Sequence, residues 1–405
     1  MLLLDFKDRK IGYKGYKSYE YLDKDKDYKS FALAKEIDRV KPYLIDLNPS
    51  EEERALNIAR NNICITLHEH PTIIPEDTRE LYSYEGEGRE VTAYEALSCS
   101  LWDVVFDNLM DGTCVISSKA GWKWLDVIHD LGMRSCDIAH QDFLIKGSSI
   151  EDMYRAKKEG KIAWFIALEA STMIENEVDR IDILYGLGTR MMGICYSESN
   201  NLGSGIKESS DGGLTLFGRT AVERMNKIGM AIDVSHSGEK TAMDTIKYSK
   251  KPVFITHTGA KTLWNTKRLR GDDVLKACAD KGGVIGIEAA PHTTITKNHP
   301  RHNIESIMEH FEYVKDLVGI DHVSFGPDCL YGDHVALHGV FSNNLSTAFT
   351  KAANYERVEY VEGFENTTEA SHNILRWLVK HNYSDEDIAK VLGGNSIRAL
   401  KEIWI

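Results

Sequence analysis

The stretch GRTAVERMNKIGMAIDVSHSGEKTAMDTIKYSKKPVFITHTG, residues 218–259, decides the fold class. It contains two successive units of a helix followed by a strand: amphipathic helical patterns at 218–229 and 238–250 precede apolar, β-branched runs at 229–236 and 252–259. Parallel strands need a crossover connection, which is usually a helix. The alternation therefore predicts an α/β protein with a parallel sheet.

The same alternation extends along the chain from residue 61. Eight strand-like runs can be counted, and eight such units favour a closed (β/α)8 TIM-type barrel over an open doubly wound sheet. The predicted strands are 63–70, 112–118, 161–170, 190–197, 229–236, 252–259, 282–290 and 322–329. Helices at 368–382 and after Ser384 should cover the outside of the barrel. Residues 1–60, rich in Tyr and Lys, are expected to form an N-terminal extension that packs on a main domain spanning 61–405.

Composition limits the classes of function. Of the 405 residues, 42% are hydrophobic and 27% are charged, as in a folded globular chain. The net charge of −13 argues against nucleic acid or an anionic membrane as partner, so a small-molecule substrate fits better. The first ten residues carry too few apolar residues for a secretory signal, and no run approaches the ~20 of a membrane span. Seven scattered cysteines without a CxxC pair suit a reducing cytoplasm.

Candidate metal ligands stand at the ends of several predicted strands, where barrel enzymes place their active sites. The first strand ends in His68-Glu69-His70, and side-chain alternation turns both imidazoles to one side and Glu69 to the other. Four later strands end in Glu169, His236, His257 and Asp328. A single histidine in a strand is most simply a core or surface residue, but imidazoles and carboxylates converging from separate strands indicate a zinc-like site.

The number of ligands predicts two ions. Four histidines and Glu169 exceed the three protein ligands of one catalytic zinc, and they suit two divalent cations, most simply Zn²⁺, that share Glu169 as a bridge. Such a pair lowers the pKa of a bridging water, supplying hydroxide, and polarises the carbonyl under attack. Asp328 can take the proton and pass it to the leaving group. Hydrolysis of an amide or ester is therefore expected, with zinc, manganese, iron or cobalt left open.

The chain from about residue 60 to residue 405 resembles the renal (membrane) dipeptidase family, peptidase family M19, of amidohydrolase-like enzymes. The resemblance is carried by GLTLFGRTAVERMNKIGMAIDVSH (213–236), PVFITHTGA (252–260), DDVLKACADKGGVIGI (272–287) and SDEDIAKVLGGNSIRAL (384–400). These enzymes are metal-dependent barrels that cleave dipeptides, often with a D-residue on the C-terminal side. The resemblance therefore implies a metallo-dipeptidase acting on L,L and L,D dipeptides, and it leaves a homodimer open.

The resemblance also implies individual roles. The family's metal ligands fall on His68, Glu169, His236 and His257, and its strand-eight acid falls on Asp328. Its arginine that holds the substrate carboxylate falls on Arg268, a pairing that a guanidinium makes well.

Three positions depart from the family pattern. His70 replaces an aspartate, which leaves one negative charge fewer beside the cations. Tyr196 replaces a histidine thought to stabilise the oxyanion, a role in catalysis and substrate binding that a phenol can also fill. Leu269 replaces a common asparagine next to the arginine. Two alternatives therefore stay open: hydrolysis of a non-peptide amide or lactone at the same metals, and a catalytically silent homologue that binds a ligand or partner.

Overall fold

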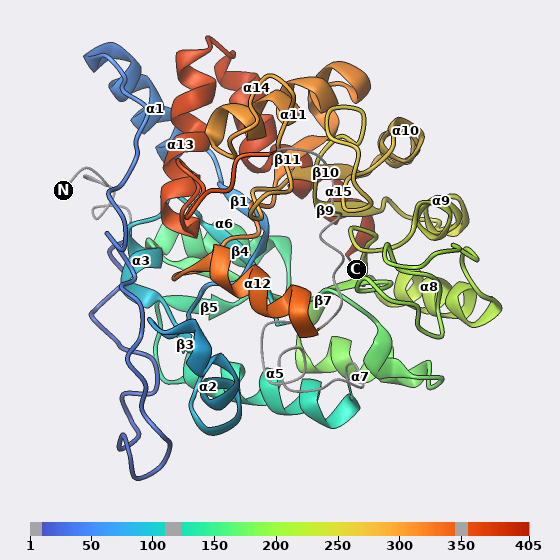
Figure 1. Ribbon diagram of the computed structural model, residues 1–405, viewed down its shortest axis with the longest axis horizontal. Helices are drawn as coiled ribbons and strands as arrows, with labels where there is room; N and C mark the ends of the chain where they lie inside the picture. The colour runs from blue at the N-terminus through green and yellow to red at the C-terminus, as the bar shows by residue number, and fades with distance from the viewer. Residues whose placement is uncertain (1–9, 110–122, 345–354, 405) are drawn as a thin grey trace.

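The computed structural model describes residues 10–109, 123–344 and 355–404, and in these ranges eight parallel strands form a barrel surrounded by helices (Figure 1). In spatial order the strands are β1 (Ile65–Glu69), β4 (Val104–Asn108), β6 (Ile162–Leu168), β7 (Thr189–Gly193), β8 (Ala231–Asp233), β9 (Phe254–Thr258), β10 (Val284–Ile287) and β11 (Val323–Phe325). The chain after β11 lies beside β1, since Asp328 N donates to His68 O (3.1 Å) and His70 N to Cys329 O (3.0 Å). The predicted TIM-type barrel is thus confirmed.

Helices connect the strands and form the outer layer (Figure 1). Between successive strands lie α5 (Trp124–Ala139), α6 (Ile150–Glu159), α7 (Asp179–Leu187), α8 (Leu216–Ile228), α9 (Glu239–Tyr248), α10 (Asp272–Asp280) and α11 (Ile304–Val318). The remaining helices are α1 (Pro49–Asn61), α2 (Leu81–Glu87), α3 (Tyr94–Ser98), α12 (His334–Asn344), α13 (Thr367–Lys380), α14 (Asp385–Ala389) and α15 (Asn395–Ile403). The helix that the sequence predicted after Ser384 begins there, because the Ser384 hydroxyl accepts from Asp387 N.

The second barrel strand is β4, and the sequence analysis missed it. The predicted strand at 112–118 lies outside the described residues. The apolar pattern of β4 is hard to recognise in the sequence because it is short and two acidic residues interrupt it, Asp103 just before the strand and Asp107 within it. Both are buried and ion-paired, Asp103 with Lys10 (2.8 Å) and Asp107 with Arg134 (3.0 Å), so the strand tolerates them. A short strand, β5 (Leu144–Lys146), pairs with β6 beside the barrel, and β2 (Thr72–Ile73) pairs with β3 (Val91–Thr92).

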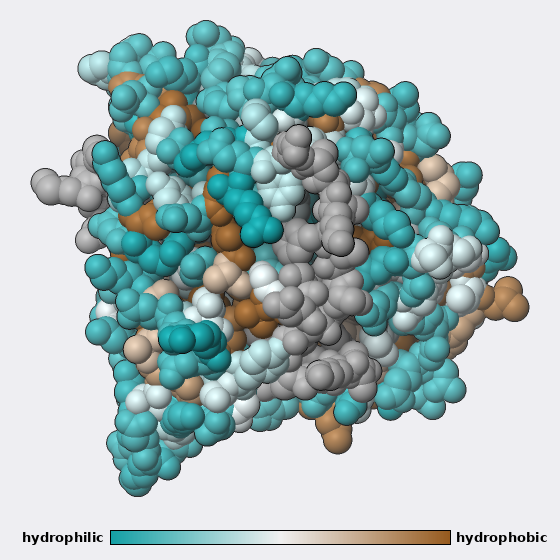
Figure 2. All heavy atoms as spheres, in the orientation of Figure 1, coloured by the Kyte–Doolittle hydropathy of each residue, from teal (hydrophilic) through white to brown (hydrophobic). Residues whose placement is uncertain are grey.

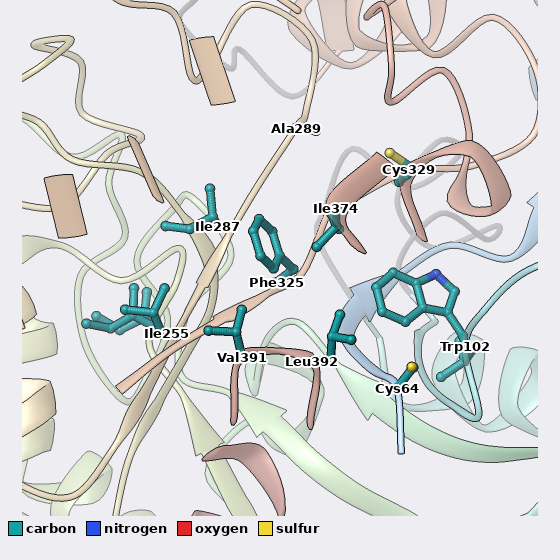
Figure 3. Close-up of a cluster of buried hydrophobic side chains, with 14 of the residues drawn as sticks. Cys64, Trp102, Ile255, Ile287, Ala289, Phe325, Cys329, Ile374, Val391 and Leu392 are labelled. Carbon is teal, nitrogen blue, oxygen red and sulfur yellow. The ribbon is translucent and has the colours of Figure 1, made fainter. Parts of the chain in front are cut away.

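Apolar side chains fill the barrel and the layer between it and the helices. Inside, Phe106, Phe165 and Trp404, which follows α15, form a cluster of three rings in which Phe165 stacks on Phe106 and on Trp404, with ring centroids 5.3 and 5.0 Å apart. The Trp404 indole donates to the carbonyl of Arg190, near the start of β7, so α15 covers the N-terminal end of the barrel. Outside, residues of β9, β10 and β11 pack against α13 and the segment after α14 (Figure 3). The candidate site lies at the opposite end of the barrel, where the strands have their C-terminal ends.

The segment before α1 runs along one side of the barrel (Figure 1). Its tyrosines pack on or near α5: Tyr16 donates to Asp137 Oδ1 (2.7 Å), and the ring of Tyr21 stacks on His140. The division of the chain at residue 60 stays a prediction. The face in Figure 2 is mostly hydrophilic, with scattered apolar spots. In the described ranges, no helix combines the length and apolar character needed to cross a bilayer.

Candidate metal centre

The five residues that the sequence assigned to a metal site lie together at the C-terminal mouth of the barrel. His68 belongs to β1 and His257 to β9, while His70, Glu169 and His236 follow the ends of β1, β6 and β8. With Asp328 they form two groups whose ligand atoms all lie within 4.8 Å of one another: His68, His70, Glu169 and Asp328 in one, and Glu169, His236 and His257 in the other. Glu169 is common to both groups.

The two carboxylate oxygens of Glu169 face different histidines. Oε1 lies 2.7 Å from His68 Nε2 and 3.4 Å from His70 Nε2. Oε2 lies 3.8 Å from His236 Nε2 and has no hydrogen-bond partner among the described residues, although it is buried. The Nε2 atoms of His236 and His257 are 2.9 Å apart. This donor set, with ring nitrogens facing one another around an unsatisfied carboxylate oxygen, fits two divalent cations bridged by Glu169.

The contacts of the Nδ1 atoms explain why Nε2 of each ring faces the site. His70 Nδ1 lies 2.9 Å from the backbone oxygen of Asn108, a carbonyl that can only accept, so Nδ1 carries a hydrogen, and in the neutral ring Nε2 then offers its lone pair. His236 Nδ1 lies 3.2 Å from Ser197 Oγ. A ligand histidine is usually oriented in this way by a partner of its other nitrogen.

His257 is oriented by a buried chain of residues that the sequence analysis missed. The Thr256 hydroxyl donates to Asp233 Oδ2 (2.9 Å), so it accepts from His257 Nδ1 (2.8 Å), which leaves His257 Nε2 without a hydrogen. Asp233 is held in turn at Oδ1 by Ser235 N and Oγ (3.1 and 2.6 Å). Asp233 and Thr256 are therefore positioning residues for His257.

Two backbone features place the acidic residues of the site. A Cβ on Gly193 would lie 1.9 Å from Glu169 O, so only glycine lets β7 approach the end of β6 this closely. Asp328 has a left-handed φ of 58°, which is uncommon outside glycine and occurs often at functional sites. Glu69, which turns away from the histidines, fixes this segment because its Oε2 accepts from Cys329 N at 2.9 Å.

Electrostatics at the mouth follow from burial and from the carboxylates. Burial lowers the pKa of His68, but Glu169 and Asp328 outweigh this effect and raise the pKa to about 9. Burial holds the pKa of His236 and of His257 well below the usual range, so both rings are neutral and can act as metal ligands. Burial acts to raise the pKa of Glu169, but the charge of His68 outweighs it and keeps the carboxylate ionised.

The three remaining predicted site residues border this centre. Asp328 Oδ1 lies 3.2 Å from His70 Nε2, and the Asp328 side chain is 13% exposed. The half-buried Tyr196 ring lies 4.4 Å from the His236 ring, centroid to centroid, and burial raises the pKa of its phenol. Arg268 Nη1 donates to His257 O (3.1 Å), while its Nη2 pairs with Glu288.

Glu288, directly after β10, is the other residue that the sequence analysis missed. It is fully buried, and it forms a third group with His257 and Asp328, with ligand atoms within 4.8 Å of one another. Glu288 could have been found from the sequence because it lies near the end of the predicted strand 282–290. The same position at a strand end identified Glu169 and Asp328.

Comparison with known proteins places the chain in a family. The profile of the family described as Membrane dipeptidase (Peptidase family M19) matches residues 123–341, more than half of the chain. The chain belongs to peptidase family M19. The resemblance found in the sequence is thereby confirmed.

Relatives of this M19 protein include two fungal proteins. It is 30% identical to dipeptidase verJ of Clonostachys rogersoniana over 290 residues, which are 71% of this chain and 66% of the relative. It is 26% identical to dipeptidase tcpJ of Claviceps purpurea (strain 20.1) over 266 residues, which are 65% of this chain and 56% of the relative. The chain thus spans less than two thirds of either relative.

Solved structures share the fold. An amidohydrolase from Pseudomonas aeruginosa superposes with a TM-score of 0.69 at 23% identity, covering 86% of this chain and 99% of that one. A metallopeptidase from Rhodobacter sphaeroides, liganded with a phosphinate mimic of the dipeptide L-Ala-D-Ala, gives a TM-score of 0.63 at 16% identity, covering 85% and 100%. At these identities the likeness shows the barrel fold alone.

Proposed function

We propose that this protein is a metal-dependent hydrolase that cleaves dipeptides or dipeptide-like amides at two divalent cations, most simply Zn²⁺. The observation that carries the proposal is the position of Glu169, whose two oxygens face the His68–His70 pair and His236 respectively. Family membership and relatives named dipeptidases support the same reaction class. Residues 61–405 would form the catalytic unit, with 1–60 packed on it.

In this proposal His68 and His70 would hold one cation, His236 and His257 would hold the other, and Glu169 would contribute to both. When bound, the cations would polarise the scissile carbonyl and lower the pKa of a water. Glu169 and the four imidazoles would determine where the cations bind. The rings of His70, His236 and His257 are held in place because their Nδ1 atoms have hydrogen-bond partners outside the site.

Asp328 is the residue proposed to move the proton. Burial acts to raise its pKa, but hydrogen bonds with His68 and His70 outweigh burial and hold the pKa well below the usual range, so the carboxylate is ionised. It can therefore accept a proton from the attacking water and deliver it to the leaving nitrogen. Tyr196, whose phenol stays protonated, would donate a hydrogen bond to the carbonyl oxygen as negative charge develops there.

Metal analysis and a substrate panel test the proposal. The protein is loaded with Zn²⁺, Mn²⁺ or Co²⁺, the bound metal is measured by elemental analysis, and L,L and L,D dipeptides are assayed for cleavage by chromatography. We expect two ions per chain and turnover of at least one dipeptide class. Glu169→Gln should lower kcat/KM by more than about 100-fold. This exceeds the usual effect of replacing a residue that only orients a metal ligand by a hydrogen bond.

The matched control is Glu175→Gln, which changes an exposed carboxylate paired with Arg180 at 3.2 Å and should leave turnover unchanged. One ion or none per chain, or no cleavage of any substrate by the fully loaded protein, would contradict the proposal.

A further inference from the structure

The Arg268 guanidinium, expected from the resemblance to bind a substrate carboxylate, already has an internal carboxylate partner. Arg268 Nη2 pairs with Glu288 Oε2, and the side chains of Arg268 and Glu288 are only 15% and 0% exposed. Asp328 Oδ2 lies 3.9 Å from the same nitrogen. Two carboxyl groups thus surround one guanidinium, so the donors that would hold a substrate carboxylate already have acidic partners.

The backbone of Glu288 is held beside Arg268. Its backbone N donates to Thr258 O (3.0 Å), and its carbonyl accepts from Thr294 Oγ1 (2.9 Å), so both sides of the residue are fixed to the barrel. A substrate carboxylate at Arg268 would therefore sit beside the carboxyl groups of Glu288 and Asp328, in a buried place where a further acceptor competes with them for the same donors.

The pair nevertheless offers a binding pattern. Arg268 provides N–H donors, and Glu288 Oε1 is a buried acceptor with no hydrogen-bond partner among the described residues. A carboxamide carries one acceptor and N–H donors side by side, so it can satisfy both residues. A carboxylate carries only acceptors and leaves Glu288 Oε1 unsatisfied.

We propose that Glu288 is a specificity residue that makes this subsite select an uncharged carboxamide and reject a free C-terminal carboxylate. The substrate class is thus a dipeptide-like amide with a blocked carboxyl end. This inference rests on the proposed hydrolase function for its catalytic meaning, but it concerns binding, so the two can be tested apart.

The experiment compares each dipeptide acid with its C-terminal carboxamide on the metal-loaded protein. The kcat and KM of cleavage are measured for both forms, and binding is measured separately by calorimetry. We expect wild-type kcat/KM and affinity to favour the carboxamide by about 10- to 100-fold, the effect of a hydrogen bond to a charged group, with the difference mainly in KM. Glu288→Gln should remove or reverse the preference while two metal ions per chain remain bound.

Controls separate this inference from its alternatives. Glu175→Gln, which removes an exposed member of another Glu–Arg pair, should keep the wild-type preference. Binding of the acid as tight as the amide by wild-type protein would overturn the proposal without any variant. Loss of metal in Glu288→Gln would also overturn it, because Glu288 would then be a ligand. If neither form is cleaved but the amide is bound selectively, the proposed hydrolase function fails and the specificity of the subsite stands.

Discussion

Thr256→Val is the substitution that tests most directly how the metal centre is built. Thr256 is 2% exposed, and its hydroxyl links Asp233 Oδ2 to His257 Nδ1. Valine keeps the shape and the backbone bond from residue 256 N to Asp233 Oδ1 (2.9 Å), so the strand should persist. It leaves His257 Nδ1 and one Asp233 oxygen unpartnered, and each such buried group costs about 1–3 kcal/mol.

The loss should appear as weaker metal binding. Removing an orienting partner behind a metal ligand typically lowers metal affinity about 10- to 100-fold, or about 1.4–2.7 kcal/mol. Affinities for Zn²⁺ and Mn²⁺ are measured by competition with a chelator, and guanidinium unfolding with excess chelator gives the stability without metal. The matched control is Thr245→Val, whose hydroxyl is also buried but, within the described part of the chain, bonds only Thr241 O in α9. Equal metal affinity in the wild type and both variants would refute the positioning role of Thr256.

Three further predictions concern the framework of the barrel. Gly193→Ala should shift Glu169, whose carbonyl would lie 1.9 Å from the new Cβ, and should lower the bound metal per chain, measured by elemental analysis; two ions retained would contradict this. Arg134→Met should lower the free energy of unfolding by about 3–5 kcal/mol, measured with guanidinium, because it leaves Asp107 buried without its cation; a loss below about 1 kcal/mol would contradict this. Burial lowers the pKa of His310 to about 4 from an ordinary 6.5, so the unfolded chain gains a proton first as the pH falls. Stability should therefore decrease from about pH 6.5 to about pH 4, by up to about 3 kcal/mol from this residue, and His310→Gln should flatten the decrease; an unchanged pH profile would contradict it.

The strand-end rule explains why most of the site could be predicted from the sequence. In a parallel barrel, every strand delivers its C-terminal residues to one mouth, so His68, Glu169, His236 and His257 meet wherever their strands lie around the ring. No long-range contact had to be known. The alternation of side chains also gave the outward direction of Glu69, which bonds Cys329 N instead of facing the site.

The parts that were missed depend on pairing between distant segments. β4 was not recognised because Asp103 and Asp107 look unsuitable for a buried strand until Lys10 and Arg134 are known to neutralise them. In the sequence, Asp233 looks like any other polar residue of a strand. Its role depends on Thr256 of the neighbouring strand, whose hydroxyl accepts from the His257 imidazole and donates to Asp233. Periodicity within one segment carries no information on such partners.

The position of negative charge connects the metal centre with the proposed substrate. By resemblance to its family, this chain lacks a carboxylate at position 70, where the imidazole of His70 contacts Glu169 and Asp328 instead. It carries Glu288 directly after β10, two strands from β1 around the barrel, paired with Arg268. Because Coulomb energy falls with distance, a carboxylate directly after β10 would act less on ions beside His68 than a carboxylate at position 70, and more on a group that approaches Arg268. The position of Glu288 can thus influence which substrate is accepted at Arg268 while the ligand set around Glu169 stays the same, as the proposed specificity requires.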